Sequence, residues 1–383
     1  MCEALGPVEG NKVLRSHWDN WLTEDHIIGL KKRGIEIVRL PIGDWTLNQY
    51  GPYVGCTDGA AEKIEWALDM FAKYDIKVLL DVHAWKDSQN GFDNSGKASN
   101  LEWFDETHFQ HWPIQTASWM GHWDGEKYDT INWDNIKLGL KTVQGLMERY
   151  GHHPAVYAFE PMNEPWWTND LDILKQWYRD AREIVRSVNP NTIFVFHESF
   201  RRDAALWNDL FPDDDMENVV LDTHPYMAFW TGDLVFETAE EYCAEYKAQL
   251  TDEKTSKIKY PMWAGEWSLG TDVCTFWLNG FNDYRDPYSY PCSWVECPKS
   301  YMPEPYGVDF DRSAAKLGPF GVSPAQTPEY GMCNADSDHF GYEDVQKLAN
   351  CHLEVFNETM QAQFMWTFRT EVGHRWSYAE SYD

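Results

Sequence analysis

Two glutamates stand where an apolar, strand-like run ends, and their setting suggests acid–base chemistry on a sugar. Glu164 lies in residues 159–165 (FEPMNEP), and Glu266 lies 102 residues later (266 minus 164), in residues 262–268 (MWAGEWS). Retaining glycosidases need two carboxyl groups about 5–5.5 Å apart, one as acid/base and one as nucleophile. A barrel of parallel strands brings separate strand ends to one mouth. The pair therefore predicts a sugar-cleaving barrel. For Glu164 in a bare Asn-Glu-Pro tripeptide, a surface glutamate in a turn is an equally good interpretation, but the other motifs of the chain disfavour it.

The neighbours of each glutamate support these roles. A general acid needs a raised pKa, which a nearby second carboxylate provides, and the proline after Glu164 biases that residue away from helix. A nucleophile must stay ionised, so it needs a cation or a hydroxyl donor beside it. We expect Arg39 and Tyr226 to serve Glu266 in this way, although a structural salt bridge is the plainer role for a buried arginine. Glu160 is the expected partner for such a bridge, or simply a buried ionic group.

Six of the 13 histidines fall in two groups with a possible chemical role, and neither group predicts a metal centre. His83, His197 and His224 each end a strand-like run, where a lone histidine is more often a satisfied structural group than a catalyst. Three more lie in a tryptophan-rich segment, at a spacing that matches no zinc-ligand template: His108, His111 and His122. We therefore expect no metal and no cofactor.

Strand-like and helix-like patterns alternate along the chain, which is typical of repeated βα units. The expected strands are residues 35–42, 77–83, 155–163, 192–197, 219–224, 262–266 and 363–368. The expected helices are residues 23–32, 60–74, 133–150, 171–188, 239–250 and 344–359. Seven strands are one fewer than a closed barrel needs, and no convincing strand precedes residue 35. A doubly wound sheet would also alternate, but no glycine-rich phosphate loop follows any strand.

Two long insertions interrupt this alternation. Residues 84–132 are rich in tryptophan and phenylalanine, and residues 270–341 are rich in proline, glycine, tyrosine and cysteine. Loops of this length in a compact domain are usually functional, so we expect both to wall the cleft. No internal repeat or low-complexity tract is present, and a single catalytic domain over residues 1–383 is expected.

The composition disfavours several classes of partner. The chain carries 32 Lys+Arg against 62 Asp+Glu, a net charge of -30. Nucleic acid requires basic patches, and an acidic surface also disfavours anionic membranes and acidic polysaccharides. Neutral glycans remain compatible, and solubility is the plainer explanation of the charge. The 21 Trp, 20 Tyr and 19 Phe include flat rings suited to the apolar faces of pyranoses, although most of them should lie in the core.

Eight cysteines and one sequon bear on the cellular compartment. The absence of a CxxC pair argues against a zinc ribbon. Five cysteines fall between Cys274 and Cys351, which fits one or two disulfides in an oxidising compartment or free buried thiols. Residues 357–359 form a glycosylation sequon. No apolar run is long enough to span a membrane, and no signal peptide is visible.

Several short motifs together resemble glycoside hydrolase family 5 of clan A, and most closely its fungal-type exo-β-1,3-glucanases. The matching segments follow the family order over nearly the whole chain: residues 2–6, 17–18, 21–24, 38–43, 81–83, 88–96, 162–165, 224–226, 264–268, 277–280 and 365–366. The stretch 88–96 (SQNGFDNSG) is the most specific for the exo-β-1,3 group. The Asn-Glu-Pro tripeptide at 163–165 is only family-wide.

The resemblance implies an enzyme, its fold and its reaction. It implies a (β/α)8 TIM barrel without a cofactor, in which Glu164 is the acid/base and Glu266 the nucleophile. The expected activity is that of a retaining exo-β-1,3-glucan hydrolase that releases glucose from nonreducing ends. The expected partner is a β-glucan oligo- or polysaccharide, and neither nucleic acid nor a membrane is expected to bind. We expect a monomer in an extracellular or cell-wall location.

The resemblance also assigns substrate-binding residues. Asn163 would hold the 2-hydroxyl of the sugar, and Trp366 would lie under the nonreducing sugar. Phe92 and Phe229 resemble the two aromatic residues that clamp the next sugar. The remaining predicted substrate-binding residues are Arg39, His83, Asp93, Asn94, His224 and Tyr226.

Two departures from the family pattern leave other activities as alternatives to β-1,3-glucan hydrolysis. The first family strand, with a glutamate that grips the terminal glucose, should precede Cys2 and is absent, so the expected domain is truncated at its N-terminus. The tryptophan-rich insertion at 99–132 is long for the group. Another family 5 β-glucosidase activity is therefore an alternative, on β-1,4 or β-1,6 linkages or on a lipid or phenolic glucoside. A non-hydrolytic glucan-binding fragment is a further alternative.

Overall fold

The computed structural model describes residues 1–95, 102–103, 109–110, 117–230, 234, 236–271, 340–370 and 374–381. The chain divides into two compact units. Unit 1 comprises Met1–Ala98, Pro113–Asp222 and Lys257–Pro261. Unit 2 comprises Ser99–Trp112, Thr223–Ser256 and Met262–Asp383.

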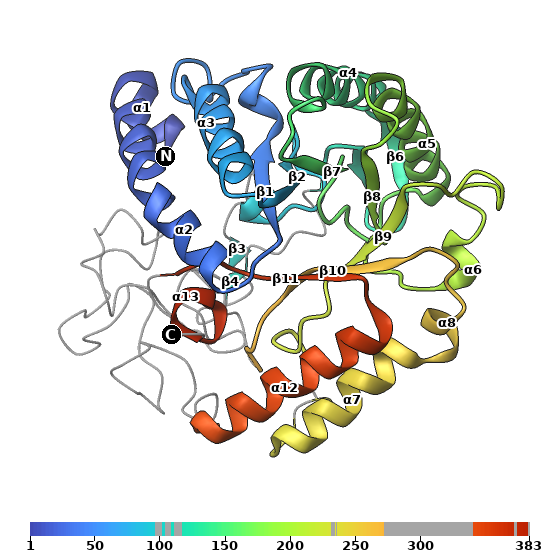
Figure 1. Cartoon of the computed structure of the whole chain (residues 1–383). Helices are drawn as coiled ribbons and strands as arrows, with labels where there is room; N and C mark the ends of the chain where they lie inside the picture. The colour runs from blue at the N-terminus through green and yellow to red at the C-terminus, as the bar shows by residue number, and fades with distance from the viewer. Residues whose placement is uncertain are drawn as a thin grey trace. The chain divides into compact units, whose positions relative to one another are not determined.

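Unit 1 is built on parallel strands whose order in the sheet follows the chain (Figure 1). These strands are β1 (Ile37–Gly43), β2 (Lys77–Ala84), β7 (Val156–Glu160), β8 (Ile193–His197) and β9 (Val219–Thr223). Each pairs in parallel with the next. Every residue of β2 after Lys77 is buried, as expected for a parallel strand covered on both faces. The carboxyl ends of these strands therefore share one edge of the sheet.

Helices precede and connect the strands of unit 1. They are α1 (Cys2–Trp21), α2 (Glu24–Lys32), α3 (Ala60–Lys73), α4 (Trp133–Tyr150), α5 (Leu171–Val188) and α6 (Ala204–Trp207), with the short 3-10 helices η1 (Asp44–Thr46) and η2 (Asp93–Ser95). Helices α4 and α5 lie side by side (Figure 1). There the Trp177 ring of α5 meets the rings of Trp85 and Trp119 edge-on, with centroids 5.7 and 5.4 Å away.

Capping residues explain where three of these helices begin. Thr23 and His26 form a capping box at the start of α2. Asn132 accepts a hydrogen bond from the amide of Asn135 at the start of α4, and Asp170 caps α5 in the same way. Each such cap satisfies backbone donors that the first turn would leave unpaired.

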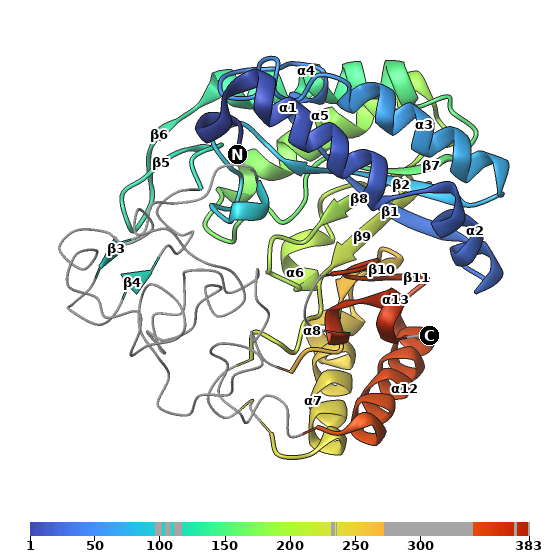
Figure 2. The same ribbon diagram turned by 90° about the vertical axis from the view of Figure 1, so that its left-hand side faces the viewer.

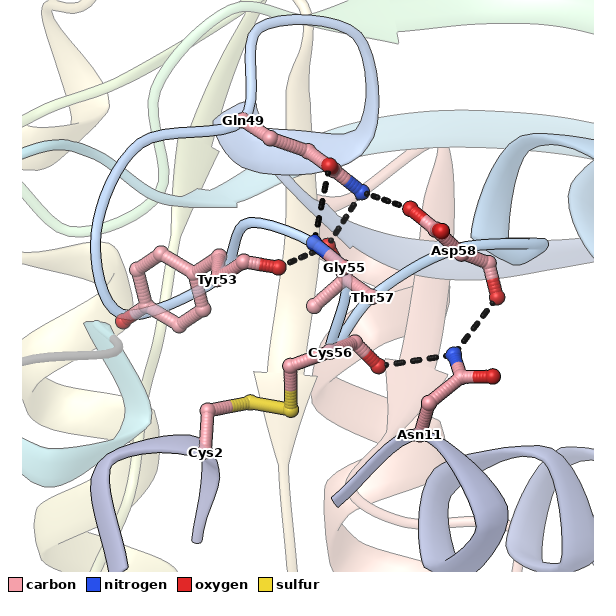
Figure 3. Close-up of a disulfide and its surroundings, with 8 residues drawn as sticks. All are labelled: Cys2, Asn11, Gln49, Tyr53, Gly55, Cys56, Thr57 and Asp58. Carbon is pink, nitrogen blue, oxygen red and sulfur yellow. Dashed lines mark hydrogen bonds between the residues drawn. A yellow bond between two sulfur atoms is a disulfide. The ribbon is translucent and has the colours of Figure 1, made fainter. Parts of the chain in front are cut away.

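The N-terminal helix α1 is tied to the loop that follows β1 (Figure 3). Cys2 forms a disulfide with Cys56. Asn11 Nδ2 donates hydrogen bonds to the carbonyl oxygens of Cys56 and Asp58, both at 2.8 Å. On the loop itself, the Gln49 side chain accepts from the Gly55 amide at 3.2 Å. This connection anchors a helix that residue periodicity did not predict.

Short antiparallel pairs lie in the first insertion. Strand β3 (Glu102–Trp103) pairs with β4 (Phe109–Gln110), and β5 (Gly121–Trp123) pairs with β6 (Tyr128–Ile131). The prediction that residues 84–132 and 270–341 wall a cleft falls largely outside the described residues, so it stays a prediction.

Unit 2 contains two parallel strands and the helices packed with them. The strands are β10 (Met262–Trp267) and β11 (Ala362–Met365). The helices are α7 (Ala239–Thr251), α8 (Glu253–Ser256), α12 (Tyr342–Thr359), α13 (Tyr378–Ser381) and the 3-10 helix η8 (His374–Trp376). Helices α7 and α12 run side by side in both views (Figures 1 and 2), and a disulfide between Cys243 and Cys351 joins them.

The core of unit 2 lies under the strand that carries Glu266. His352 of α12 stacks on Tyr246 of α7, with ring centroids 4.0 Å apart, and meets the Trp267 ring at 5.3 Å. Burial lowers the pKa of His352 to about 3, so this imidazole is neutral and acts as an aromatic core residue. The disulfide and this stack together fix both helices beneath β10.

All seven expected strands and all six expected helices are confirmed, with bounds that move by no more than three residues. Residues 1–36 contain α1 and α2 and no strand, as expected. None of the described helices is long and apolar enough to cross a membrane.

Candidate active site

Glu164 lies in a tight turn just beyond the carboxyl end of β7. Its φ angle is 43°, in the left-handed region that a residue with a Cβ seldom adopts. Its side chain is buried, with only 6% of the residue exposed. The Asn163 amide donates to the carbonyl oxygen of Val82 at 3.1 Å. Backbone strain of this kind persists where surrounding contacts enforce it, and it is common at functional sites.

Gln89 holds this turn against the end of β2. Its Nε2 donates to the carbonyl oxygens of His83 and Asn163, both at 2.9 Å. Its Oε1 accepts from the Trp85 amide at 3.2 Å, and its carbonyl oxygen accepts from the Trp166 amide at 3.1 Å. Gln89 was not predicted as a site residue, although it lies inside segment 88–96, which resembles the exo-β-1,3 group.

Arg39 of β1 organises a buried polar cluster beside Glu164. Its guanidinium donates to Glu160 Oε2 at 3.0 Å and to Asn163 Oδ1 at 2.6 Å, and it lies 3.1 Å from Asp81 Oδ2. The expected pairing of Arg39 with Glu160 is therefore confirmed. Because both carboxylates are fully buried, their charges require this cation.

The same cluster orients His83 and Asn163. Asp81 Oδ2 lies 2.7 Å from His83 Nδ1, and His83 Nε2 lies 3.5 Å from Asn163 Nδ2. With its amide oxygen held by Arg39, Asn163 keeps its amide nitrogen on the His83 side. Asp81 was not predicted as a site residue; its signal was a carboxylate two positions before a strand-end histidine, on the same side of the strand.

The residues after Glu164 are fastened to the end of β8. Ser199 Oγ lies within hydrogen-bond distance of the carbonyl oxygens of Pro165 (2.8 Å) and Trp166 (3.1 Å). His197 Nδ1 accepts from the Ser199 amide at 3.0 Å, which matches the structural role expected for this histidine. The turn that carries Glu164 is thus fixed from both neighbouring strands.

The structure describes the side chains of only some of the predicted substrate-binding residues in segment 88–96. Phe92 is half-buried and packs edge-on against Trp166, with ring centroids 5.2 Å apart. Asn94 is exposed, and Asp93 lies in η2 with its side chain outside the described set.

Unit 2 holds Glu266 near the end of β10. Only 4% of Glu266 is exposed. The Tyr226 hydroxyl donates to Glu266 Oε2 at 2.8 Å, which confirms the expected donor, and His224 Nδ1 lies 3.6 Å from the same oxygen. A carboxylate that accepts a hydrogen bond from a buried hydroxyl donor keeps a fixed orientation.

Aromatic residues support this carboxylate and its donor. The Tyr226 ring stacks on Trp376, with centroids 5.4 Å apart, and Phe229 meets Tyr226 edge-on at 5.5 Å. Phe229 is 46% exposed. Trp366 directly follows β11, and its amide donates to the Trp267 carbonyl oxygen at 2.7 Å. Trp376 was not predicted, because its position depends on a turn of chain far from Tyr226 in sequence.

The histidines of the tryptophan-rich segment bear on the prediction that no metal binds. His122 lies 3.0 Å from Asp129, and His108 and His111 lie outside the described residues. The expectation of no metal and no cofactor stays a prediction.

The chain is similar to known proteins over residues of both units. The family model "Cellulase (glycosyl hydrolase family 5)" matches residues 7–294. A glucan 1,3-beta-glucosidase of Blumeria graminis is 29% identical over 393 aligned residues, which cover 98% of this chain and 75% of the relative. Glucan 1,3-beta-glucosidase 2 of Wickerhamomyces anomalus is 27% identical, covering 98% of this chain and 76% of the relative.

Solved structures show the fold. Rutinosidase from Aspergillus niger superposes with a TM-score of 0.63 at 18% identity, covering 98% of this chain and 85% of that one. Endoglucanase Cel5A from Thermotoga maritima superposes with a TM-score of 0.51 at 13% identity, covering 92% and 84%. The predicted fold class, a (β/α)8 barrel, is confirmed. With a family model that matches most of its length, this chain belongs to glycosyl hydrolase family 5 and is a glycoside hydrolase.

Proposed function

We propose that this glycoside hydrolase is a retaining, exo-acting β-1,3-glucan hydrolase that releases glucose from nonreducing ends. One observation carries the proposal: Glu164 and Glu266 are each buried at the carboxyl end of a parallel strand, among polar groups that hold them in place. The linkage is suggested by the relatives, which are named glucan 1,3-beta-glucosidase.

In the first step Glu266 attacks the anomeric carbon, and a glycosyl-ester bond forms as the glycosidic C–O bond breaks. Glu164 gives its proton to the departing oxygen, so the leaving sugar departs as a neutral alcohol. The hydrogen bond from the Tyr226 hydroxyl to Oε2 restrains the orientation of the Glu266 carboxylate. Holding the nucleophile in this way lowers the entropic cost of attack.

In the second step the roles of Glu164 reverse. Its carboxylate takes a proton from water, the water oxygen attacks the anomeric carbon, and Glu266 leaves as a carboxylate. Two inversions give net retention, so the released glucose is the β anomer. Glu164 ends the cycle protonated, as it began.

The buried polar cluster around Arg39 contributes to this chemistry by orienting Asn163. With its Oδ1 held by Arg39 at 2.6 Å, Asn163 presents its amide nitrogen as a donor to the 2-hydroxyl of the sugar. Hydrogen bonds to that hydroxyl strengthen in the oxocarbenium-like transition state. His83, fixed by Asp81, is a second polar neighbour for the same sugar.

Aromatic residues account for the proposed exo action. Trp366 is the proposed platform for the nonreducing sugar, and Phe92 and Phe229 are the proposed clamp for the next one. Asp93, Asn94, His224 and Tyr226 complete the proposed binding set. A single catalytic domain, a monomeric state and an extracellular or cell-wall location also belong to this proposal. The disulfides Cys2–Cys56 and Cys243–Cys351 support the location, because structural disulfides persist in oxidising compartments.

Proton NMR of the purified chain with laminarin tests the proposal. The anomeric signal of β-glucose should appear first, with the α signal growing later as the sugar mutarotates. A first product with the α configuration would contradict retention, and early release of longer oligosaccharides would contradict exo action. Glu266→Gln should abolish the signal; full turnover by this variant would remove the assignment of the nucleophile.

A panel of disaccharides with β-1,3, β-1,4 and β-1,6 linkages tests the linkage. We expect the β-1,3 compound to have the highest kcat/KM. Preference for another linkage, or for a lipid or phenolic glucoside, would replace the β-1,3 assignment while leaving the retaining mechanism intact. Binding of laminarin by folded protein without any glucose release would favour the non-hydrolytic alternative.

A further inference from the structure

Asp44 is a buried carboxyl group of unit 1 that the proposed chemistry does not use. It begins η1, directly after β1, and only 2% of it is exposed. Gly43 of β1 pairs with Ala84 of β2, so Asp44 and the residues after Ala84 leave the ends of neighbouring parallel strands. Burial of a carboxyl group is costly, and it raises the pKa of Asp44 to about 6. A buried ionisable group at a strand end therefore calls for a role beyond packing.

The Asp44 carboxyl fastens the loop that follows β2. Its Oδ2 accepts a hydrogen bond from the Lys86 amide at 2.9 Å, and its Oδ1 accepts from the Tyr50 hydroxyl at 2.8 Å. The Lys86 amide belongs to the peptide group that joins Trp85 to Lys86. The carbonyl oxygen of this peptide group accepts from the Ser88 amide at 2.8 Å. Both polar ends of the peptide group are therefore held.

The segment that presents Asp44 is itself anchored at several points. Asn48 Nδ2 donates to Thr142 Oγ1 of α4 at 3.1 Å. The Trp45 ring stacks on Tyr53, with centroids 4.4 Å apart. At its far end, Cys56 is bonded to Cys2 of α1 (Figure 3). The carboxyl group is thus carried by a fixed segment, which a group that positions another element requires.

Trp85 and Gln89 connect this anchored loop to the turn that carries Glu164. Trp85 Nε1 donates to the carbonyl oxygen of Pro161 at 3.1 Å, and its amide donates to Gln89 Oε1 at 3.2 Å. Gln89 Nε2 donates to the carbonyl oxygen of Asn163, the residue before Glu164, at 2.9 Å. Because a strained backbone persists only while its surroundings enforce it, a shift of Trp85 and Gln89 would let Glu164 move.

We propose that Asp44 is a positioning residue for Glu164. Through the Lys86 amide it fixes residues 85–89, and these residues hold the strained turn in which Glu164 lies. In this role Asp44 acts through Trp85 and Gln89 and does not itself take part in the reaction. The inference rests on the proposed function, since the acid/base role of Glu164 belongs to that proposal.

Hydrolysis of two substrates with different leaving groups tests the positioning role. The departing oxygen of laminaribiose needs a proton, whereas the phenolate of 2,4-dinitrophenyl β-glucoside leaves without one. For Asp44→Ala, kcat/KM for laminaribiose should fall about tenfold, part of the roughly 100-fold cost of misplacing a reacting group by about 1 Å. The kcat/KM value for the dinitrophenyl glucoside should stay parental, because a shifted Glu164 matters little when no proton is required. A loss of folded protein would lower both values equally.

Two further variants of Asp44 isolate its contact with Lys86. Asp44→Asn keeps an oxygen for the Lys86 amide and offers its own amide group to the Tyr50 hydroxyl, so it should recover most of the laminaribiose activity. Asp44→Ser, whose hydroxyl is one bond shorter than the carboxylate, should lose activity as Asp44→Ala does, and it replaces that variant if Asp44→Ala does not fold. Parental kcat/KM for laminaribiose in both Asp44→Ala and Asp44→Ser, or equal losses for both substrates, would overturn the proposal. An Asp44→Asn variant no more active than Asp44→Ala would also overturn it.

Tyr260→Phe is the matched control, because it also removes a side-chain acceptor from one backbone amide in unit 1. The Phe211 amide donates to the buried Tyr260 hydroxyl at 3.0 Å. The ratio of the two kcat/KM values should equal that of the parent chain. A ratio that changes as far as in Asp44→Ala would show that any such loss has this effect, and it would overturn the assignment to Asp44.

Hydrogen exchange followed by mass spectrometry separates this inference from the proposed function, because it requires no turnover. The Trp166 amide, which donates to the Gln89 carbonyl oxygen at 3.1 Å, reports on the turn. Faster exchange in peptides that cover residues 163–167 of Asp44→Ala, reversed in Asp44→Asn, would support the positioning role even if the parent chain hydrolysed no β-glucoside. Equal exchange in all three proteins would refute that role even if the parent chain released β-glucose from laminarin as proposed.

Discussion

At the scale of single residues, the site depends on polar groups that hold other polar groups. Arg39 holds Asn163 and two buried carboxylates, and Tyr226 holds Glu266. Under the proposed function, such contacts pre-organise the reacting atoms before substrate arrives, which is a main source of catalytic rate.

Removing the hydroxyl of Tyr226 tests this pre-organisation. Tyr226→Phe keeps the ring on Trp376 but removes the donor that orients Glu266 Oε2, so kcat should fall by about 100-fold, the order of loss expected when a reacting group is misplaced by about 1 Å. The fold should persist because the aromatic contacts remain. Initial rates on laminaribiose measure the effect.

Tyr242→Phe is the control, because the Tyr242 hydroxyl donates to the carbonyl oxygen of Thr271 in the same unit. Its kcat should match that of the parent chain. A Tyr226→Phe variant with parental kcat would show that the hydroxyl does not contribute to the reaction.

A buried carboxyl next to β1 predicts a pH dependence of stability. Burial raises the pKa of Asp44 to about 6, although its oxygens accept hydrogen bonds from the Tyr50 hydroxyl (2.8 Å) and the Lys86 amide (2.9 Å). The unfolded carboxyl titrates near 3.8. The folded state therefore binds the proton more tightly, and stability is lost as pH rises from about 4 through about 6. The loss should approach about 3 kcal/mol.

Urea unfolding at pH 4 and pH 7 of the parent chain and Asp44→Asn measures this contribution. The stability difference between the two proteins should shift by a few kcal/mol in favour of Asp44→Asn as the pH rises. A difference that is the same at both pH values would show that Asp44 titrates normally.

At the scale of elements, the strands of unit 1 and the α7–α12 pair of unit 2 position the site in different ways. Backbone pairing between β1, β2, β7, β8 and β9 sets the strand ends of unit 1. In unit 2, side-chain packing positions the strand that carries Glu266. Helices α7 and α12 support β10 through the ring contacts of Tyr246, His352 and Trp267. The disulfide between Cys243 and Cys351 locks that pair.

Replacing Cys243 and Cys351 together by serine should lower the free energy of unfolding by about 4–5 kcal/mol, because the bond restricts the unfolded chain across a separation of 108 residues. Urea midpoints under non-reducing conditions measure the change. The matched comparison is the double serine variant at Cys2 and Cys56, with a separation of 54 residues. Loop entropy alone makes its loss smaller by about 0.6 kcal/mol. A Cys243/Cys351 variant with an unchanged midpoint would contradict the stabilising role.

At the scale of the whole molecule, two properties bear on the proposed function: the net charge and the division into two compact units. A net charge of -30 disfavours nucleic acid and anionic surfaces as partners on electrostatic grounds, and their absence as partners stays a prediction. The two proposed catalytic glutamates lie in different compact units. A single catalytic domain over residues 1–383 is a proposal that requires both units to act on one sugar.

Much of the fold could be read from the chain, because alternating apolar runs and helical spacings are local signals. The strands β1, β2 and β7 to β11 show them clearly, as does the Ile64, Leu68 and Phe71 face of α3. Helix α1 escaped prediction because Gly6 and Pro7 interrupt it and because its anchor, Cys56, lies 54 residues away.

The sequence by itself determined the residue types of the site and the strands that carry them, since strand-end positions follow from short-range pattern. Only the tertiary structure decided which groups meet. Asp81, Gln89 and Trp376 join the site through contacts with residues that the pattern does not link to them. The disulfide partners likewise could not be predicted, because contacts between distant segments depend on how the chain folds in three dimensions, and sequence periodicity carries no record of them.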